Sequence, residues 1–206
     1  MWSLTLTTPP AAEPVLVDPD VLQHCRIDSD VAELEAVDLA GKIKAAREAC
    51  EHATERQLIT ATWTLQMDCW AERELYRNGA IHVPRPPLAS VTSVKFYDTA
   101  GNQQTWAAGA AGYLVDAPSG PEAQRGRIYP APDVDWPDLQ DRHNAVEVIF
   151  VAGYGAAGAA VPERLRRGIL LYVGELYERR EESVVGVSVS PTVLGAERLW
   201  QQMRAY

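Results

Sequence analysis

The chain has 206 residues, of which 47% are apolar, and this is enough to bury a substantial hydrophobic core. Its formal net charge of −9 argues against a protein that wraps nucleic acid, because such binding depends on lysines and arginines that displace counterions from the phosphates. The three cysteines, Cys25, Cys50 and Cys69, are widely spaced and contain no CxxC pair. This pattern argues against a disulfide framework and favours reduced thiols in a cytosol.

Neither the first residues nor the longest apolar stretch suggests export or membrane insertion. The first residues, MWSLTLTTPP, do not place a basic region before an apolar one, so no secretory signal is expected. The longest apolar stretch, residues 148–161, is too short and too rich in glycine to span a bilayer. We therefore expect a protein that is neither secreted nor inserted in a membrane.

Two helices are predicted in the first part of the chain. Asp18 before a proline is typical of an N-cap, and it predicts a short helix over residues 19–26. Asp30, with a glutamate three positions later, resembles a capping box, and apolar residues at helical spacing continue over residues 30–57. This second segment is predicted as one long helix, with Gly41 as its weak point.

The pattern changes from helix to strand at residue 62. In residues 62–70, TWTLQMDCW, the apolar side chains of Trp63, Leu65, Met67 and Cys69 alternate with polar ones, which predicts a strand with one buried face. The proline-rich residues 81–88 predict an extended edge or connector.

Further short strands follow before the chain returns to helix. They are predicted, with a turn over residues 98–102, at residues 91–97, 113–115, 127–129 and 145–151. Residues 62–70 and 145–151 are the two ends of this region and both must lead back to the helical part. We therefore expect them to pair or to share one sheet, with Leu65 and Phe150 facing inwards.

A helix is predicted after Pro162, and its wide apolar arc indicates neighbours on two sides. Its first turn carries Arg164, Arg166 and Arg167, which oppose the positive end of the helix dipole and cost about a few tenths of a kcal/mol each unless they are paired. An acidic partner surface would remove that cost. Residues 183–191 are predicted as an extended arm or short strand, and residues 193–203 as a last helix.

One segment has the form of a nucleotide-binding loop. Residues 153–158, GYGAAG, match the pattern GxGxxG and follow a predicted strand. However, Pro162 places the helix start after the third glycine, whereas phosphate binding needs the helix N-terminus within the loop. A flexible connector is therefore favoured, with a nucleotide-binding enzyme kept as an alternative.

The sequence signals for a metal site are as weak as the signal for a nucleotide-binding loop. His24–Cys25 and Cys50-x-His52 could supply zinc ligands, but neither pair has a typical ligand spacing, so core cysteines and surface histidines are favoured. The aspartates of residues 133–141 lack the glycine and the closing glutamate of a calcium loop. No motif of a hydrolase, metalloprotease or P-loop enzyme occurs. We expect no catalytic residue, no cofactor and no bound metal.

Four pieces of the sequence, taken in order, resemble the head-tail connector proteins of long-tailed bacteriophages and of their prophage and gene-transfer-agent relatives. These proteins are also called adaptor or head-completion proteins. The pieces are ACEHATERQLITATW (49–63), VPRPPLASVTSVKFYD (83–98), FVAGYG followed by VPERLRRGILLYVGELYERRE (150–181), and LGAERLWQQMRAY (194–206). The resemblance covers nearly all of the chain.

The resemblance implies an α+β fold and a place in the virion. The N-terminal and C-terminal helices, residues 1–60 and 153–206, would form a helical core, with a β-rich insertion over residues 61–152. It also implies a ring, commonly of twelve copies, docked on the portal protein at the capsid vertex and presenting a platform for a stopper or tail-completion protein. DNA would pass through the channel without specific binding, for which an acidic wall is suited. Such a protein is made in the host cytoplasm and has no catalytic activity.

Two sets of site residues follow from this interpretation. Large side chains near the C-terminus have little of their own domain left to bury them, which favours a portal-binding segment with flanking arginines. This set comprises Arg198, Leu199, Trp200, Met203, Arg204 and Tyr206. The expected subunit interface comprises Arg164, Arg166, Arg167, Arg179, Arg180, Glu181 and Glu182.

Simpler interpretations remain open for both sets. The charges at 179–182 could form a solvated helix end with i,i+4 pairs, and the last helix could pack back on its own core. A small monomeric β-rich binding domain is a further alternative to the connector.

Overall fold

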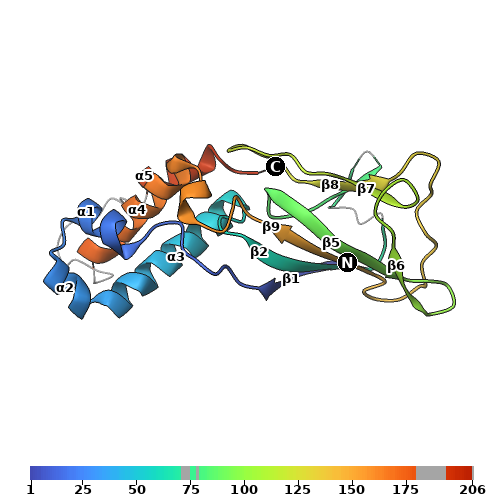
Figure 1. The fold of residues 1–206 in the computed structure, drawn as a ribbon, viewed down its shortest axis with the longest axis horizontal. Coiled ribbons are helices and arrows are strands. Elements are labelled where there is room, and N and C mark those ends of the chain that lie inside the picture. The colour runs from blue at the N-terminus through green and yellow to red at the C-terminus, as the bar shows by residue number, and fades with distance from the viewer. Residues whose placement is uncertain (71–74, 78, 180–193, 206) are drawn as a thin grey trace. The chain divides into compact units, whose positions relative to one another are not determined.

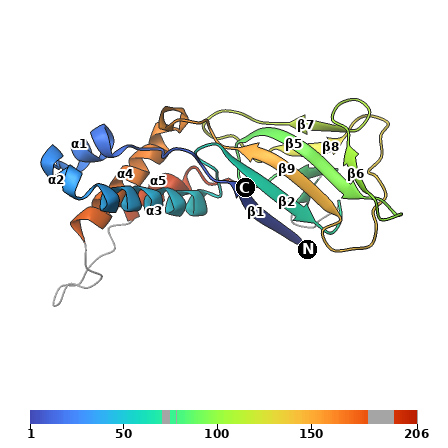
Figure 2. The same cartoon turned by 60° about the horizontal axis from the view of Figure 1, so that its bottom comes forward.

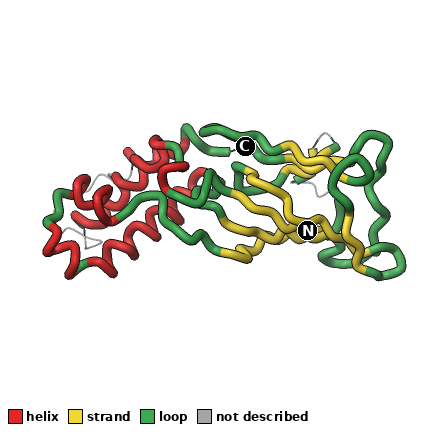
Figure 3. The backbone as a smooth tube through the Cα atoms, viewed as in Figure 1, coloured by secondary structure: helices red, strands yellow, loops and turns green. Residues whose placement is uncertain are grey.

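The computed structural model describes residues 1–70, 75–77, 79–179 and 194–205 (Figure 1). The chain divides into two compact units. The β-rich unit contains Met1–Ala11, Thr60–Tyr154 and the C-terminal Ala205, and the helical unit contains Ala12–Ile59 and Gly155–Arg204. Figure 3 shows that the helices belong to one unit and the strands to the other, which confirms the predicted α+β class.

The main sheet of the β-rich unit is antiparallel and has the order β1-β2-β9-β5-β6. Its strands are β1 (Trp2–Thr8), β2 (Ala61–Met67), β5 (Leu88–Tyr97), β6 (Gln103–Trp106) and β9 (Val146–Ala152). Strands β2 and β9 pair without a register shift from Ala61 opposite Ala152 to Met67 opposite Val146. The prediction that the two ends of the β-rich region pair with each other is confirmed.

The inner face of this sheet follows the alternation of the sequence. Leu65 and Phe150 are both fully buried, as predicted, among the apolar side chains of β2, β5 and β9. Cys69, which was predicted on the same face, is exposed, because β2 ends at Met67 and the alternation ends with it.

The N-terminal strand β1 was not predicted. Its residues Trp2, Leu4 and Leu6 alternate with polar ones, but the strand forms by pairing with β2, which lies about sixty residues further along the chain. Thr7 Oγ1 and Thr64 Oγ1 share a hydrogen bond of 2.7 Å across this pair. Residues 1–11 therefore belong to the β-rich unit, and the expected division at residue 60 is wrong for this segment.

A second antiparallel sheet has the order β3-β4-β8-β7. Its strands are β3 (Tyr76–Arg77), β4 (Ala80–His82), β7 (Tyr113–Asp116) and β8 (Arg127–Pro130). The predicted strands 113–115 and 127–129 are confirmed as the neighbours β7 and β8. In contrast, the segment 81–88 is a connector only over residues 83–87, because β4 and β5 include its two ends.

Loops of the β-rich unit are held by local polar contacts and by aromatic packing. The Asp98 carboxylate accepts hydrogen bonds from the backbone N–H groups of Ala100 and Asn102, which confirms the predicted turn. Trp70 lies with its ring centroid 5.0 Å from that of Trp136 and donates its indole N–H to the carbonyl of Pro137 at 2.8 Å. These contacts hold the loop before β9 against the core.

The helical unit is built from α1 (Leu22–Cys25), α2 (Ser29–Leu34), α3 (Ala36–Thr54), α4 (Glu163–Glu178) and α5 (Leu194–Gln201), with a wide turn over Val17–Val21 before α1. α4 contacts α1, α3 and α5, which confirms that its apolar arc serves more than one neighbour. No helix in the described ranges is both long and apolar enough to cross a membrane.

The long helix predicted over residues 30–57 is two helices. The helix is interrupted at Glu35 (φ −102°, ψ 11°) and not at Gly41, which lies inside α3. A helical glycine costs only about 1 kcal/mol, and the burial of Leu39 and Ile43 on either side of Gly41 offsets that cost.

Candidate interaction surfaces of the helical unit

The arginines in the first turn of α4 have partners within their own unit. Arg166 donates from Nε to the Pro14 carbonyl at 3.0 Å, from Nη1 to Glu163 Oε2 at 3.0 Å and from Nη2 to Asp20 Oδ2 at 3.2 Å. Arg167 donates from Nε to Glu163 Oε1 at 2.7 Å. Glu163 also places a negative charge at the positive end of the helix dipole. The expectation that Arg166 and Arg167 need an external acid to offset the helix dipole is therefore wrong.

The three arginines nevertheless differ in exposure. The Arg166 side chain is only 23% exposed and its guanidinium is occupied inside the unit, so it is withdrawn from the expected interface set. Arg164 is exposed and Nη1 lies 3.8 Å from Met203 Sδ. Arg167 keeps 64% of its side chain exposed despite its bond to Glu163. Of these three arginines, Arg164 and Arg167 therefore face outwards.

A polar cavity of about 390 Å³ lies beside this turn, between α1 and α4. Asp20 and Glu163 face Arg26, Arg166 and Arg167 along its walls. The two acids are paired with Arg166 and Arg167, so most of the charge on the cavity walls is already compensated within the unit.

The last helix packs on its own unit. Trp200 is 1% exposed and Met203 is 3% exposed. The Trp200 ring lies 5.6 Å from that of Tyr172 and covers Gly168, where a Cβ atom would lie only 2.3 Å from Trp200 Nε1. The expectation that Trp200 and Met203 have little of their own domain left to bury them is therefore wrong, because α4 supplies the apolar surface that buries them.

Polar contacts also hold the C-terminal segment. Arg56, itself buried, donates from Nε to the Met203 carbonyl, and Arg204 Nη2 pairs with Glu55 Oε1 at 2.6 Å. Arg198 is exposed and Leu199 is half-buried. Tyr206 lies outside the described residues.

The charge cluster after α4 is described only at its start. Arg179 Nη1 lies 3.0 Å from Glu175 Oε1, an i,i+4 pair along the end of the helix. Arg180, Glu181 and Glu182 and the predicted arm of residues 183–191 lie outside the described residues.

Gly168 makes the close contact of α4 with α5 possible. Replacing Gly168 with Ala should destabilise the helical unit by about 1–3 kcal/mol, because the new methyl group overlaps the Trp200 indole and forces α5 away from α4. Urea unfolding followed by circular dichroism at 222 nm measures the change. Gly41 is the matched control, since no heavy atom lies within 4 Å of a Cβ built there. Gly41→Ala should be neutral or stabilising by up to about 1 kcal/mol, and equal losses in both variants would contradict the packing argument.

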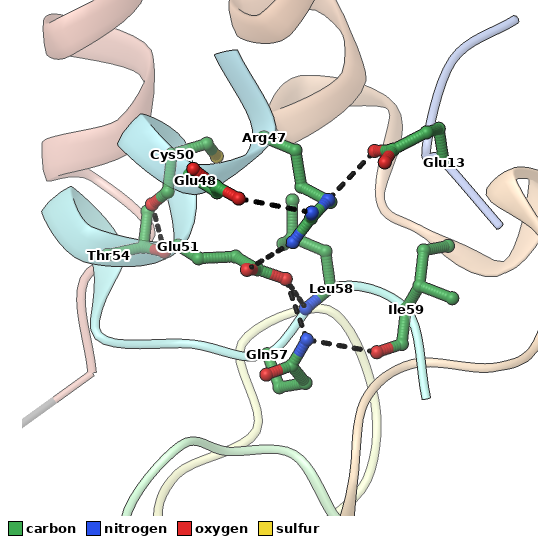
Figure 4. A network of polar contacts seen from close by, with 9 residues as sticks. All are labelled: Glu13, Arg47, Glu48, Cys50, Glu51, Thr54, Gln57, Leu58 and Ile59. Atoms are coloured by element: carbon green, nitrogen blue, oxygen red, sulfur yellow. Dashed lines mark hydrogen bonds and ion pairs between the residues drawn. The ribbon is translucent and has the colours of Figure 1, made fainter. Parts of the chain in front are cut away.

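A buried polar network, which the sequence patterns did not predict, links α3 to two other segments of the unit (Figure 4). Arg47 donates from Nε to Glu13 Oε2 at 2.8 Å and from Nη1 to Glu51 Oε2 at 2.9 Å. Glu51 Oε1 in turn accepts the Gln57 side-chain amide at 2.7 Å and the Leu58 backbone N–H at 3.1 Å. The i,i+4 spacing of Arg47 and Glu51 beside buried Ala46 and Cys50 was the only sequence signal for this network.

The charges in this network support each other. Burial by itself would lower the pKa of Arg47, but the carboxylates of Glu51 and Glu13 outweigh it and raise the pKa. Glu13 lies before the first helical turn and Gln57 and Leu58 lie after α3. The network thus fixes how the chain enters and leaves the N-terminal helices.

The glycines of the GYGAAG segment are explained by packing. Gly153 has φ +131°, a conformation that favours glycine. A Cβ atom on Gly155 would lie 2.7 Å from the Ala160 methyl group, and one on Gly158 would lie 2.5 Å from the Pro14 carbonyl oxygen. The preceding strand β9 belongs to an antiparallel sheet, and α4 begins only at Glu163. The segment therefore has the geometry of a connector and not of a dinucleotide site.

The candidate zinc residues do not converge. Among the described residues, no group of three or more His, Cys, Asp or Glu side chains is placed to hold a metal ion. Burial raises the pKa of Cys50, and it also raises that of Cys25, where Glu178 adds to the effect. Both thiols are thus less able to supply the thiolate that zinc binds.

Known proteins resemble this chain in structure. No protein-family model and no curated protein matches the sequence. A chain from a structure described as the neck of an empty gene transfer agent (GTA) particle computed with C6 symmetry matches with 25% identity and a TM-score of 0.76. The match covers 99% of this chain and 96% of that chain.

Two further structures agree with it. A chain in the virion of a native GTA particle matches with 26% identity and a TM-score of 0.74, over 98% of this chain and 95% of that chain. A chain in the neck of a native GTA particle computed with C12 symmetry shares the fold, at 23% identity and a TM-score of 0.66, over 100% and 96% of the two chains. The resemblance to head-tail connector proteins is thus confirmed, and the chain is, over nearly its whole length, a structural relative of proteins in the neck and virion of gene transfer agent particles.

Proposed function

We propose that this chain is a structural protein of the neck of a gene transfer agent or phage particle, at the junction of capsid and tail. The observation that carries the proposal is the mutual coverage of the matches, which extends over at least 95% of both chains at TM-scores of 0.74 and 0.76. Such coverage means that both units, and not a single common motif, are shared. The role is structural and not catalytic, in keeping with the packing reasons found for the glycines of the GYGAAG segment.

Within the neck, we propose the role of head-tail adaptor. The chain would form a ring below the portal protein and present a platform for a stopper or tail-completion protein. The C6 symmetry of the matched neck supports a cyclic assembly, and the twelve copies typical of connectors are a multiple of six. The net charge of −9 suits a ring through which DNA moves without being held.

The portal contact is assigned to the exposed members of the C-terminal set. With Trp200 and Met203 buried, the outward-facing candidates are Arg198, half-buried Leu199 and Arg204, whose pair with Glu55 lies at the surface. Rim charges of this kind orient a partner more than they add affinity.

Deletion of the gene in a producing strain tests the proposal. The strain should make DNA-filled capsids without tails, and electron micrographs should show the tailed fraction restored by the unaltered gene. An Arg198→Glu copy should restore it only partly, while the purified variant keeps the melting temperature of the unaltered protein, because Arg198 is exposed.

A second experiment locates the protein within the particle. In purified particles, antibody labelling or a cryo-EM reconstruction should place the chain between capsid and tail. Tailed particles in the deletion strain would overturn the neck assignment, and full restoration by Arg198→Glu would overturn only the portal contact.

A further inference from the structure

The segment formed by α2 and the first turn of α3 exposes aliphatic side chains to solvent. Val31 is 39%, Leu34 89% and Val37 90% exposed. Val31 and Leu34 lie one turn apart on α2, and Val37 follows the break at Glu35 in the first turn of α3, whereas Ala32 and Leu39 are buried in the unit. We call Val31, Leu34 and Val37 the apolar ridge. A cluster of exposed aliphatic side chains of this kind is typical of a surface that another molecule covers.

The ridge has an acidic rim. Residues 27–41 contain five acids and neither lysine nor arginine. These acids are Asp28, Asp30, Glu33, Glu35 and Asp38. Asp30 and Glu33 are exposed beside Val31 and Leu34, and Asp38 pairs with Lys42 one turn further along α3. A molecule that covers the ridge should therefore present apolar surface bordered by positive charge.

The same unit carries such a surface on α4. Arg164, Arg167 and Leu171 recur at intervals of three and four residues, and all three are exposed. Leu171 is 44% exposed, next to Gly195 of α5. We call Arg164, Arg167 and Leu171 the basic face. Figures 1 and 2 show α2 at the end of the helical unit, on a different element from the basic face.

We propose that the apolar ridge of one copy packs against the basic face of the next copy in the ring. The inference rests on the proposed ring function. A closed ring uses heterologous contacts, so each subunit must carry two different and complementary faces. Two ridges in contact would place acids against acids, whereas the ridge and the basic face pair opposite charges around apolar centres.

In this contact the aliphatic side chains supply the buried area and the charged side chains set the register. Leu34 and Val37 are, together with Met1, the most exposed large apolar residues of the described chain. They lose water when Leu171 of the next copy covers them. The guanidinium groups of Arg164 and Arg167 meet the carboxylates of Asp30 and Glu33 and set the register of the two copies.

Charge reversal in the deletion strain tests this pairing. The ridge variant is Asp30→Arg with Glu33→Arg, and the face variant is Arg164→Glu with Arg167→Glu. Each variant alone should lower the number of tailed particles about tenfold or more, because every contact in its ring pairs like charges. The two variants expressed together should restore tailed particles, because rings of six or twelve copies can alternate them so that every contact again pairs opposite charges.

A neutral change and a charge control complete the design. Leu34→Ser with Val37→Ser removes apolar area without adding charge, and it should lower tailed particles about tenfold while the melting temperature of the purified protein stays unchanged. Thr92→Arg with Thr105→Arg adds the same type of charge at exposed positions of the β-rich unit and should leave tailed particles unchanged.

The outcomes separate the possible occupants of the ridge. If the ridge meets the portal instead, the ridge variant fails alone and co-expression does not rescue it, which overturns the inference. Normal tails with either variant alone also overturn it, while the deletion phenotype still supports the neck function. Normal tails in the deletion strain overturn the neck function itself.

Discussion

Replacing Leu65 with Asp should destabilise the β-rich unit by more than about 4 kcal/mol. Leu65 is fully buried in the middle of β2, opposite Val148 of β9 and Leu4 of β1. An ionised carboxylate at this position would have no partner among the apolar side chains of the core, and an unpaired buried charge is one of the few causes of losses this large. Tryptophan fluorescence during urea unfolding should report the change, since the Trp70, Trp106 and Trp136 cluster belongs to this unit.

Two comparisons make the result specific. Leu65→Asn keeps the size of Asp without its charge, and burial should raise the folded-state pKa of the new Asp above its unfolded value of about 4. The extra loss of the Asp variant should therefore be absent below about pH 4 and should grow as pH rises above it. Thr92→Asp, at an exposed position of β5, should change stability by less than about 0.5 kcal/mol. A Leu65→Asp protein as stable as the unaltered chain would show that the inner face of β2 is wrongly assigned.

Replacing Glu51 with Ala should destabilise the helical unit by about 3–5 kcal/mol, because it leaves the buried Arg47 guanidinium without its main intrahelical partner. The same change removes the acceptor of the Gln57 amide and of the Leu58 backbone N–H. Urea unfolding followed at 222 nm should show the loss.

Glu48 provides the matched control for this prediction. It lies one turn away, contacts the same guanidinium at 3.6 Å and keeps 57% of its side chain exposed. Glu48→Ala should cost less than about 1 kcal/mol, as exposed ion pairs do. If Glu48→Ala and Glu51→Ala cost the same, burial of the network is not what makes it stabilising.

These two sites show different degrees of predictability from the sequence. The burial of Leu65 follows from alternation within nine residues, and the pairing of β2 with β9 follows from the need to return the chain to the helical part. The buried pair of Arg47 and Glu51 has the same i,i+4 spacing as an exposed ion pair, so spacing alone could not show that it is buried.

The candidate interfaces were predicted less well than the fold. The basic turn of α4 was recognised, but the sequence does not show that Asp20, 146 residues away, accepts a hydrogen bond from Arg166. Trp200 has the residue type of an interface anchor, yet Gly168 on α4 provides the flat backbone surface against which it is buried. The apolar ridge was overlooked because Val31, Leu34 and Val37 match helical periodicity equally well whether they face a core or solvent.

The sequence by itself determined the strands β2, β5, β7, β8 and β9, most of the helical segments, the α+β class and the resemblance to head-tail connectors, because periodicity and turn residues act over a few neighbours. The tertiary structure alone decided that β1 joins the sheet of β2, that Arg56 binds the carbonyl of Met203, and which apolar and charged side chains remain outside. These outcomes depend on contacts between segments separated by about 60 to 150 residues. Such contacts form only when the whole unit packs, since burial is a property of the assembled core and not of a local pattern.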